Sequence, residues 1–362
     1  MLKSKLIPNM GLIICSAIFI LLGILTIATA SPPFSINEGL SPNYFLFHQL
    51  LYGFLPGFIM AFILFLFPLK GIKKMSFWIF AASYILMFLV FVPGIGITEG
   101  GASRWISIFG SSFQPSELLK LTTIIYLSAL LSSEKTKKAL ISFLIVMGLV
   151  SLALILQSDM STLVTIFIIA FTIYFCATKS KKRDFAIIAA IGGILFALMI
   201  FFAPYRMERI MTMFNPSENT SGAAYQINQT LISIGSGGID GSGLGLSAQK
   251  FGFVPESMSD SIFAIYAEEL GFLGCAFLVS MFFLLAFFSF SEAGKADGFG
   301  RLIAVGVGVW IPIQALINIA AMTNLIPLSG TPLPFLSYGG THLIVEMMSL
   351  GLLLNVSRNI DR

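Results

Sequence analysis

A large share of the scarce charge of this chain lies in one polar, Gly-rich segment, residues 205–261, set among apolar stretches that are joined by shorter connectors. Loops of this length in compact proteins are uncommon and usually functional. Asp260 stands where the segment turns into an apolar stretch, a setting that desolvates a carboxylate and tunes it as a general base. Capping of the helix that follows is an equally good explanation of Asp260 at this point. Other charged side chains of the segment include those of Arg206, Glu208, Arg209, Asp240, Lys250 and Glu256.

A second group of polar residues precedes the fourth apolar stretch. Pro115 and Glu117 suit the first turn of a helix, where proline is tolerated and an acid favours the positive end of the dipole. Lys120 lies one turn further on, and a charge placed within an apolar span is costly and marks a functional hypothesis. We expect Lys120 and Arg104 to hold an anionic head group. The alternative is an ordinary helix start with no ligand.

Three more acidic residues lie near the ends of apolar stretches. Asp159 is placed to cap the stretch that begins at residue 161, and the alternative is that it positions a ligand or a cation. Glu268 and Glu269 lie two turns into a later stretch, where acids are expensive unless they are paired. We expect them to pair with Lys120 or Arg104, or to lock helices together.

Closely spaced Pro and Gly residues mark the last long connector, residues 323–338, and continue to Gly340. Such a rigid, non-helical backbone is tolerated at membrane depth only where protein or a water-filled cavity covers it. The connector is therefore expected to form one wall of a cavity. His342 and Glu346 follow at i and i+4 and are able to pair on one helix face, but two residues do not make a metal site.

The composition is that of a polytopic membrane protein. Of 362 residues, 57% are hydrophobic and 10% charged, against roughly 25% charged in a soluble domain, and the mean hydropathy is +0.93. Apolar runs long enough to cross a bilayer recur along the whole chain. We predict an all-α protein with a single membrane domain over residues 1–362 and a large external loop at 205–261. Its ten spans are expected at 9–30, 49–69, 76–95, 117–133, 139–157, 161–178, 185–204, 262–290, 301–322 and 339–356.

The placement of Lys and Arg predicts the orientation. If the N-terminus is inside, sixteen of these residues fall on the inner connectors or ends and five fall outside. By the positive-inside rule, both termini lie in the cytoplasm. The five outer residues are Arg104, Lys120, Arg206, Arg209 and Lys250. Any reaction site is thus expected on the extracytoplasmic side.

These residues, in this order, resemble the SEDS family (shape, elongation, division and sporulation), which includes FtsW, RodA and SpoVE. The resemblance covers nearly the whole chain. It is carried by Arg104-Trp105, Gln114-Pro115-Ser116-Glu117-Leu118-Leu119-Lys120, Gly235-Ser236-Gly237-Gly238, Gly243-Leu244-Gly245, Pro255-Glu256, Asp260, Ile262-Phe263-Ala264, Glu268-Glu269-Leu270-Gly271, Pro332-Leu333-Pro334-Phe335 and Ser337-Tyr338-Gly339-Gly340. The motif at Gly243-Leu244-Gly245 is more similar to the FtsW division branch than to the elongation branch.

The resemblance implies a peptidoglycan glycosyltransferase that polymerises lipid II on the outer face of the bacterial cytoplasmic membrane. The family's essential loop aspartate falls on Asp260, which would take the proton of the acceptor 4-hydroxyl. Undecaprenyl pyrophosphate would leave the donor, and because it is a good leaving group, one carboxylate suffices where a glycosidase usually needs two. The alternative activity is that of a lipid II flippase, and a scaffold that recruits cell-wall enzymes is a third possibility.

The resemblance also implies the contacts of the site. Substrate binding is expected from Gln114, Ser116 and Ser337 together with the five outer cations. A divalent cation, Mg or Mn, would prefer oxygen ligands, and Glu117, Asp159 and Glu256 are the candidates. No organic cofactor and no nucleic acid are expected. The expected partners are a class B penicillin-binding protein, which is a transpeptidase, and other divisome or elongasome membrane proteins.

The chain departs from the family pattern at three places. Ser158 and Ser161 stand where Pro and Gly are common, and Met258-Ser259 precedes Asp260 where the family often has His-Thr. His48 stands where a basic residue is common, and it is able to be uncharged at neutral pH. None of these changes removes Asp260, so an active enzyme is expected.

Overall fold

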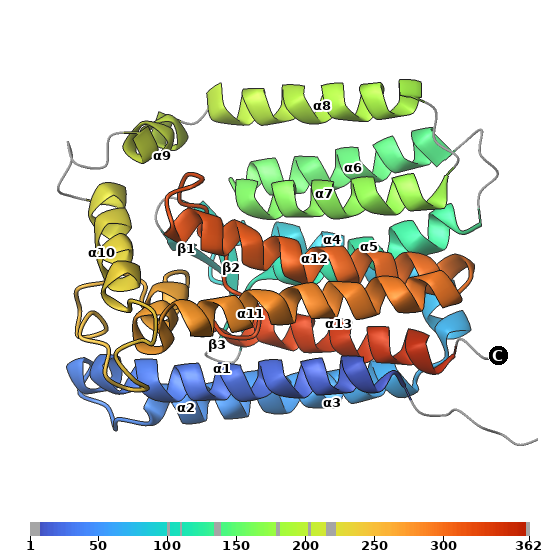
Figure 1. Ribbon diagram of the computed structural model, residues 1–362. Coiled ribbons are helices and arrows are strands. Elements are labelled where there is room, and N and C mark those ends of the chain that lie inside the picture. Colours follow the sequence, from blue (N-terminus) through green and yellow to red (C-terminus); the bar gives the residue numbers. More distant parts are fainter. Residues whose placement is uncertain are drawn as a thin grey trace, which may run out of the picture.

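The structure is a computed structural model that describes residues 8–99, 102–108, 111–133, 139–178, 182–201, 204–214 and 222–359. Most of these residues lie in long helices that run side by side in one common direction (Figure 1). The elements are α1 (Met10–Asn37), α2 (Tyr44–Gln49), the π-helical turn η1 (Leu50–Phe54), α3 (Leu55–Leu66), α4 (Leu69–Leu89), β1 (Gly96–Glu99), β2 (Ala102–Ile108), β3 (Ser111–Phe113), α5 (Pro115–Leu131), α6 (Ala139–Leu156), α7 (Met160–Ala177), α8 (Lys182–Phe201), α9 (Pro204–Phe214), α10 (Ala223–Ser236), α11 (Ile262–Lys295), α12 (Gly298–Met322) and α13 (Gly340–Arg358).

Eight helices of the described part are long and apolar enough to cross a membrane. They are α1, the continuous helix from α2 to α3, α4, α6, α7, α11, α12 and α13. The expectation of a mostly helical, polytopic fold is confirmed by these eight spans, but the strict all-α assignment was wrong, because β1, β2 and β3 form a small antiparallel sheet. The other two expected spans fall on α5, which has 17 residues, and on α8. Both run alongside the other helices in Figure 1.

Some expected boundaries were wrong. α1 does not end near Ala30 but continues to Asn37. The basic pair Lys73 and Lys74, expected in a turn, lies inside α4, because the chain reverses at Phe67 and Pro68 and the helix begins at Leu69.

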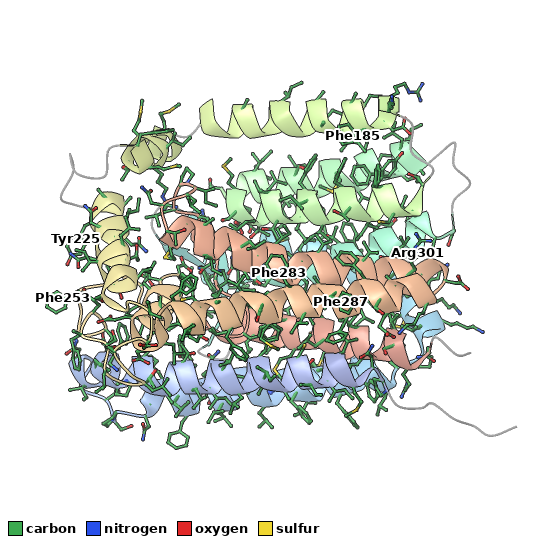
Figure 2. The ribbon with its side chains drawn as sticks, viewed as in Figure 1. Phe185, Tyr225, Phe253, Phe283, Phe287 and Arg301 are labelled. Atoms are coloured by element: carbon green, nitrogen blue, oxygen red, sulfur yellow. The ribbon has the colours of Figure 1, made fainter. Side chains whose placement is uncertain are left out.

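Apolar side chains cover the outer surface of the helices, as a lipid environment requires. Phe283 and Phe287 project outward from α11 in Figure 2 and are more than half exposed. α12 and α13 are instead largely buried within the bundle. Gln314 and Asn318 of α12 and Glu346 of α13 are fully buried and therefore face protein, not lipid.

The two ends of the bundle differ. Near the start of α1, the backbone N–H of Asn9 donates to Ser357 Oγ on α13 at 2.9 Å, so the first and last described helices meet at this end. The opposite end, on the left of Figure 1, carries the antiparallel sheet β1-β2-β3, α9, α10 and the connectors 237–261 and 323–339. α9 is seen there end-on, across the direction of the long helices.

The segment 205–261 is not a continuous loop. Among its described residues, α9 and α10 account for most of the first half, and the long irregular stretch is residues 237–261. Those irregular residues dock against a break in α11, where Gly271 has φ 63° and ψ −164°. The freed carbonyls of Glu268 and Glu269 accept from the N–H groups of Ser242 and Gly243, at 2.9 and 3.0 Å. The break is therefore stabilised by the segment that it receives.

Replacing Gly271 with Ala is expected to lower the thermal stability of the protein. A Cβ at this position would lie 2.3 Å from the backbone nitrogen of Gly241, and the positive φ adds strain. We expect a loss of about 1–3 kcal/mol, the usual cost of a strained backbone, measured as a lower melting temperature in detergent. Gly294→Ala is the control, because its Cβ would meet nothing within 4 Å in the same helix. Equal melting temperatures would contradict the prediction.

Candidate active site at the loop-bearing end of the helices

Asp260 lies at the junction of the 237–261 segment with α11, where the sequence placed it. Its backbone carbonyl accepts from Asn318 Nδ2 at 2.7 Å, which fixes the residue against α12. Ser261, not Asp260, is the N-cap residue of α11, and the helix start has no side-chain cap. Within the described residues, no hydrogen bond to the Asp260 carboxylate is found. The capping explanation is therefore wrong, and the carboxylate is left available for chemistry.

The surroundings of Asp260 tune its proton affinity. Burial is the largest cause that raises its pKa, and the neighbouring Glu256 carboxylate raises it further. Arg209 and Arg104 act in the opposite direction, and the balance is a pKa of about 6. A base of this kind is largely deprotonated at neutral pH yet still takes a proton readily.

Residues 328–339 of the last long connector form a wall beside Asp260. A Cβ at Gly330 would lie 3.4 Å from Asp260 Oδ2. Asn318 Nδ2 also donates to the Thr331 carbonyl at 2.7 Å, so one amide holds both the wall and the aspartate. Ser337 Oγ donates to the Ser259 carbonyl at 2.7 Å.

Ser337 was expected to contact substrate, but its side chain is fully buried. Besides donating to Ser259, its oxygen accepts from the Leu333 N–H at 2.8 Å. The hydroxyl thus joins two backbone segments, which is a positioning role. The prediction of a substrate contact is corrected.

Two of the five expected outer cations stay near Asp260. Arg104 on β2 donates through Nη2 to the Ser158 carbonyl at 2.6 Å, and Arg209 on α9 donates through Nη1 to the Leu328 carbonyl at 2.9 Å. Both lie close enough to Asp260 to lower its pKa. Neither makes an ion pair among the described residues. The backbone of Arg206 is in α9, but its side chain lies outside the described residues.

Lys120 is buried in the bundle and is not available to an anion. Its Nζ lies 2.8 Å from Glu117 Oε2 and 2.7 Å from Gln314 Oε1, and 5.3 Å from the centre of the Trp310 ring. Gln314 Nε2 donates on to Glu346 at 3.3 Å. The prediction that Lys120 binds an anionic head group was therefore wrong. Lys120 instead belongs to a buried hydrogen-bond network that joins α5, α12 and α13.

The charge of Lys250 is also satisfied by partners inside the protein. Its Nζ donates to Thr29 O at 3.0 Å, to Gly245 O at 2.7 Å and to Glu269 Oε1 at 3.1 Å. Glu268 accepts from Ser247 Oγ and from the Ala248 N–H at 2.9 Å. Pairing of these two acids with Lys120 or Arg104 was wrong, and the alternative that they lock structural elements together is confirmed.

Gln114, Ser116 and Asp159 form a chain of hydrogen bonds. Gln114 Nε2 donates to Ser116 Oγ at 3.1 Å, and Ser116 Oγ donates to Asp159 Oδ2 at 3.0 Å. Asp159 Oδ1 accepts from the Thr162 N–H at 3.2 Å, so the expected cap of the following helix, α7, is confirmed. Ser116 is fully buried, and its prediction as a substrate contact is corrected to a structural role.

The three candidate metal ligands do not converge. Glu117 is paired with Lys120, Asp159 caps α7, and the exposed Glu256 accepts from Ser259 Oγ at 2.7 Å. Across the described ranges, no group of three or more His, Cys, Asp or Glu side chains is placed to hold a metal ion. A three-carboxylate site built from these residues therefore does not fit the structure.

Several polar residues of the site were missed by sequence reasoning. Gln314 and Asn318 lie at i and i+4 in α12, and both are fully buried. Polar residues inside an apolar span are functional signals by default, and this signal would have found them. Glu346 and His342 were recognised in the sequence as able to pair with each other, but each binds the wall instead. Glu346 Oε2 accepts from the Phe335 N–H at 2.8 Å, and His342 Nε2 lies 3.0 Å from the Ser337 carbonyl.

Comparison with known proteins supports the resemblance found from the motifs. The FtsW/RodA/SpoVE family model, described as cell cycle protein, matches residues 9–362. The probable peptidoglycan glycosyltransferase FtsW of Geobacter sp. (strain M18) is 35% identical over 356 residues, with 96% of each chain covered. Stage V sporulation protein E of Bacillus subtilis is 34% identical over 373 residues, with 99% of each chain covered.

Solved structures share the fold over almost the full length. A chain in a structure described as "Structural coordination of polymerization and crosslinking by a peptidoglycan synthase complex" has a TM-score of 0.80 and 22% identity, covering 99% of both chains. The rod shape determining protein RodA of Thermus thermophilus has a TM-score of 0.70 and 24% identity, covering 98% of both. With a family model that spans nearly the whole chain, the protein belongs to the FtsW/RodA/SpoVE family of cell cycle proteins.

Proposed function

We propose that this protein is a peptidoglycan glycosyltransferase that polymerises lipid II into glycan strands. The single observation that carries the proposal is the Asp260 carboxylate, which has a pKa of about 6 and lies beside two arginines that are not ion-paired in the described part. The names of full-length relatives, which are probable peptidoglycan glycosyltransferases, point in the same direction.

In the proposed reaction, Asp260 accepts the proton of the acceptor 4-hydroxyl as that oxygen bonds to the anomeric carbon of the donor MurNAc. The bond from this carbon to the pyrophosphate oxygen breaks, and undecaprenyl pyrophosphate leaves with the electron pair. Positive charge near the leaving oxygens stabilises this step, because the charge develops in the transition state. Arg104 and Arg209 are placed to supply it, and Arg206 is a further candidate.

We also propose that a divalent cation, Mg or Mn, acts in the reaction, without assigning it a fixed set of protein ligands. The protein offers no preformed three-ligand site among the described residues, so no step is derived through the ion. When bound, a cation would neutralise pyrophosphate charge.

The proposed topology has ten spans within one membrane domain of residues 1–362, with α5 and α8 crossing in addition to the eight spans described. Both termini lie in the cytoplasm by the positive-inside rule. The contact between Asn9 and Ser357 supports placing them on the same side. Asp260 and the segment 205–261 are then extracytoplasmic, where lipid II polymerisation takes place.

The proposed partner is a class B penicillin-binding protein that crosslinks the new strand. Support comes from the structural neighbour described as a peptidoglycan synthase complex that coordinates polymerization and crosslinking. Other divisome or elongasome membrane proteins are expected to bind as well. Because FtsW and stage V sporulation protein E are both among the relatives, we propose a division or sporulation role ahead of an elongation role.

The test is polymerisation by the purified protein. Wild type is incubated with lipid II, with and without the partner synthase, in Mg, in Mn and in chelator, and glycan strands are separated on gels. Polymer formation is expected. A protein that moves lipid II across vesicles but makes no polymer under any of these conditions would replace the transferase with the flippase.

The rate of polymerisation is expected to rise with pH through about 6 and then level off. The base works only when deprotonated, and burial sets the pKa of Asp260 to about 6. Glu256→Gln removes a charge that raises this pKa, so the midpoint should move to lower pH. Arg209→Gln removes a charge that lowers it, so the midpoint should move to higher pH. The measurement is kcat/KM against pH, and shifts of the same sign in both variants would contradict this assignment.

A further inference from the structure

A cavity of about 280 Å³ lies between α1 and α11, apart from the site around Asp260. α1 contributes Leu22, Leu25, Thr26 and Thr29, α11 contributes Tyr266, Glu269, Leu270, Gly274 and Phe277, and Leu244 completes the wall. A dry apolar cavity of about 150 Å³ holds a benzene ring. This cavity is therefore large enough for a considerably longer piece of hydrocarbon.

The polar side chains of the cavity already have partners in the protein. Thr26 Oγ1 donates to Leu22 O at 2.7 Å, and Thr29 Oγ1 donates to Thr26 O at 3.2 Å. The Tyr266 hydroxyl donates to Gly274 O at 3.1 Å. Buried water needs two to four polar partners, and a polar ligand would have to break these bonds. The walls therefore favour an occupant that is purely hydrocarbon.

The charged residue in the lining, Glu269, belongs to a buried ion pair. Glu269 Oε1 lies 3.1 Å from Lys250 Nζ, which also donates to the Thr29 carbonyl on α1 at 3.0 Å. Lys250 therefore bridges both helices that form the walls. Because the pair is buried and neutral overall, it does not attract a charged head group into the cavity.

The remaining side of the cavity is open towards lipid. Leu25, Leu244 and Phe277 all line it and are each at least 40% exposed on the surface. The break at Gly271 lies in the middle of the α11 wall, between Leu270 and Gly274. A chain is thus able to enter sideways from the membrane.

The cavity also lies near the proposed base along the same helix. α11 begins at Ile262, two residues after Asp260, and Glu269 follows seven residues later. At 1.5 Å per residue this is roughly 10 Å. A lipid-linked sugar that reacts at Asp260 is joined to its chain only through a pyrophosphate, so its chain must enter the membrane a short distance away.

We propose that this cavity holds a segment of the polyprenyl chain of the lipid-linked substrate, an inference that rests on the proposed function. The cavity fixes where the chain leaves the membrane and so helps to orient the sugar at Asp260. Because the bilayer is as apolar as the cavity, the gain arises from close packing and positioning, not from removal of hydrocarbon from water.

Filling the cavity tests this proposal. Leu25→Trp places a large ring in the cavity wall, and Leu21→Trp is the matched control, because Leu21 is a surface residue of the same helix that does not line the cavity. With full-length lipid II, Leu25→Trp should lower kcat/KM about tenfold, an effect of positioning, and Leu21→Trp should not. With a lipid II analogue that has a short prenyl chain, both variants should match wild type.

The outcomes separate this inference from the proposed function. If wild type polymerises lipid II and Leu25→Trp loses nothing with the long chain, the cavity does not bind the substrate chain, although the function stands. If wild type makes no polymer, the function itself fails. Equal losses with long-chain and short-chain substrates would also overturn the inference.

Cross-linking of the wild type gives a second measurement that does not depend on a variant. Lipid II with a diazirine in its polyprenyl chain should label residues of α1 and α11 that line the cavity, and unlabelled lipid II should compete. A phosphatidylglycerol probe with a diazirine in its acyl chain is the comparison. If the phospholipid labels these residues and lipid II does not displace it, the occupant is bulk lipid and the proposal is overturned.

Discussion

Replacing Asp260 with Asn is expected to reduce glycan polymerisation about 10²–10⁴-fold, the usual contribution of a general base. The substitution keeps the size of the side chain but removes its ability to take a proton. The backbone carbonyl, which accepts from Asn318, is unaffected, so the fold should persist. The measurement is the initial rate of polymer formation from lipid II, with the melting temperature in detergent as a check on folding.

Glu256→Gln is the matched control for this variant. Glu256 precedes Asp260 by four residues and influences its proton affinity, but its own carboxylate is exposed and accepts from Ser259. We expect Glu256→Gln to retain most of its activity at neutral pH. Full polymerisation by Asp260→Asn, in a preparation free of other polymerases, would remove the proposed base while leaving the enzyme activity in place.

Replacing Lys120 with Met is expected to destabilise the protein by about 3–5 kcal/mol, the cost of leaving one partner of a buried ion pair alone. Lys120 is 2% exposed, and the variant would strand the Glu117 carboxylate in the bundle. It would also remove the donor that binds Gln314 at 2.7 Å. The measurement is the shift in melting temperature in detergent.

Two comparisons show whether burial is the cause. The double variant Lys120→Met with Glu117→Gln should recover much of the loss, because no charge is left unpaired. Lys295→Met should have little effect, although Lys295 also pairs with a glutamate, at 2.7 Å, because its side chain is half exposed. A stable Lys120→Met protein with only a raised KM for lipid II would instead restore Lys120 as a head-group contact.

The sequence predicted the class of the fold better than its details. Long apolar runs require helices in a membrane, because every backbone polar group must be satisfied without water. Eight of the ten expected spans were found for that reason. The break in α11 was not foreseen, since the partners of its freed carbonyls lie at Ser242 and Gly243. Such a pairing depends on how a distant segment docks.

The roles of the charged residues likewise depend on tertiary contacts that the sequence did not predict. The sequence assigns the same role, that of a cation on the predicted outer side, to Arg104, Lys120, Arg209 and Lys250. The fold surrounds Lys250 with two carbonyls and Glu269, whereas among the described residues Arg209 donates to one carbonyl, that of Leu328, near Asp260. Whether a charge is satisfied depends on neighbours up to 221 residues away along the chain, and periodicity does not report them.

The sequence by itself therefore determined that the chain is a polytopic helical membrane protein, and that a single carboxylate, Asp260, stands at the end of its longest polar segment. The tertiary structure decided which groups surround that carboxylate. Its neighbours are Asn318 on α12, the wall at Gly330 and two arginines. The side chains of Lys120, Lys250 and Ser337 are instead buried and bonded within the protein. The physical reason is that composition and hydropathy act locally along the chain, whereas burial and pairing depend on contacts between distant segments.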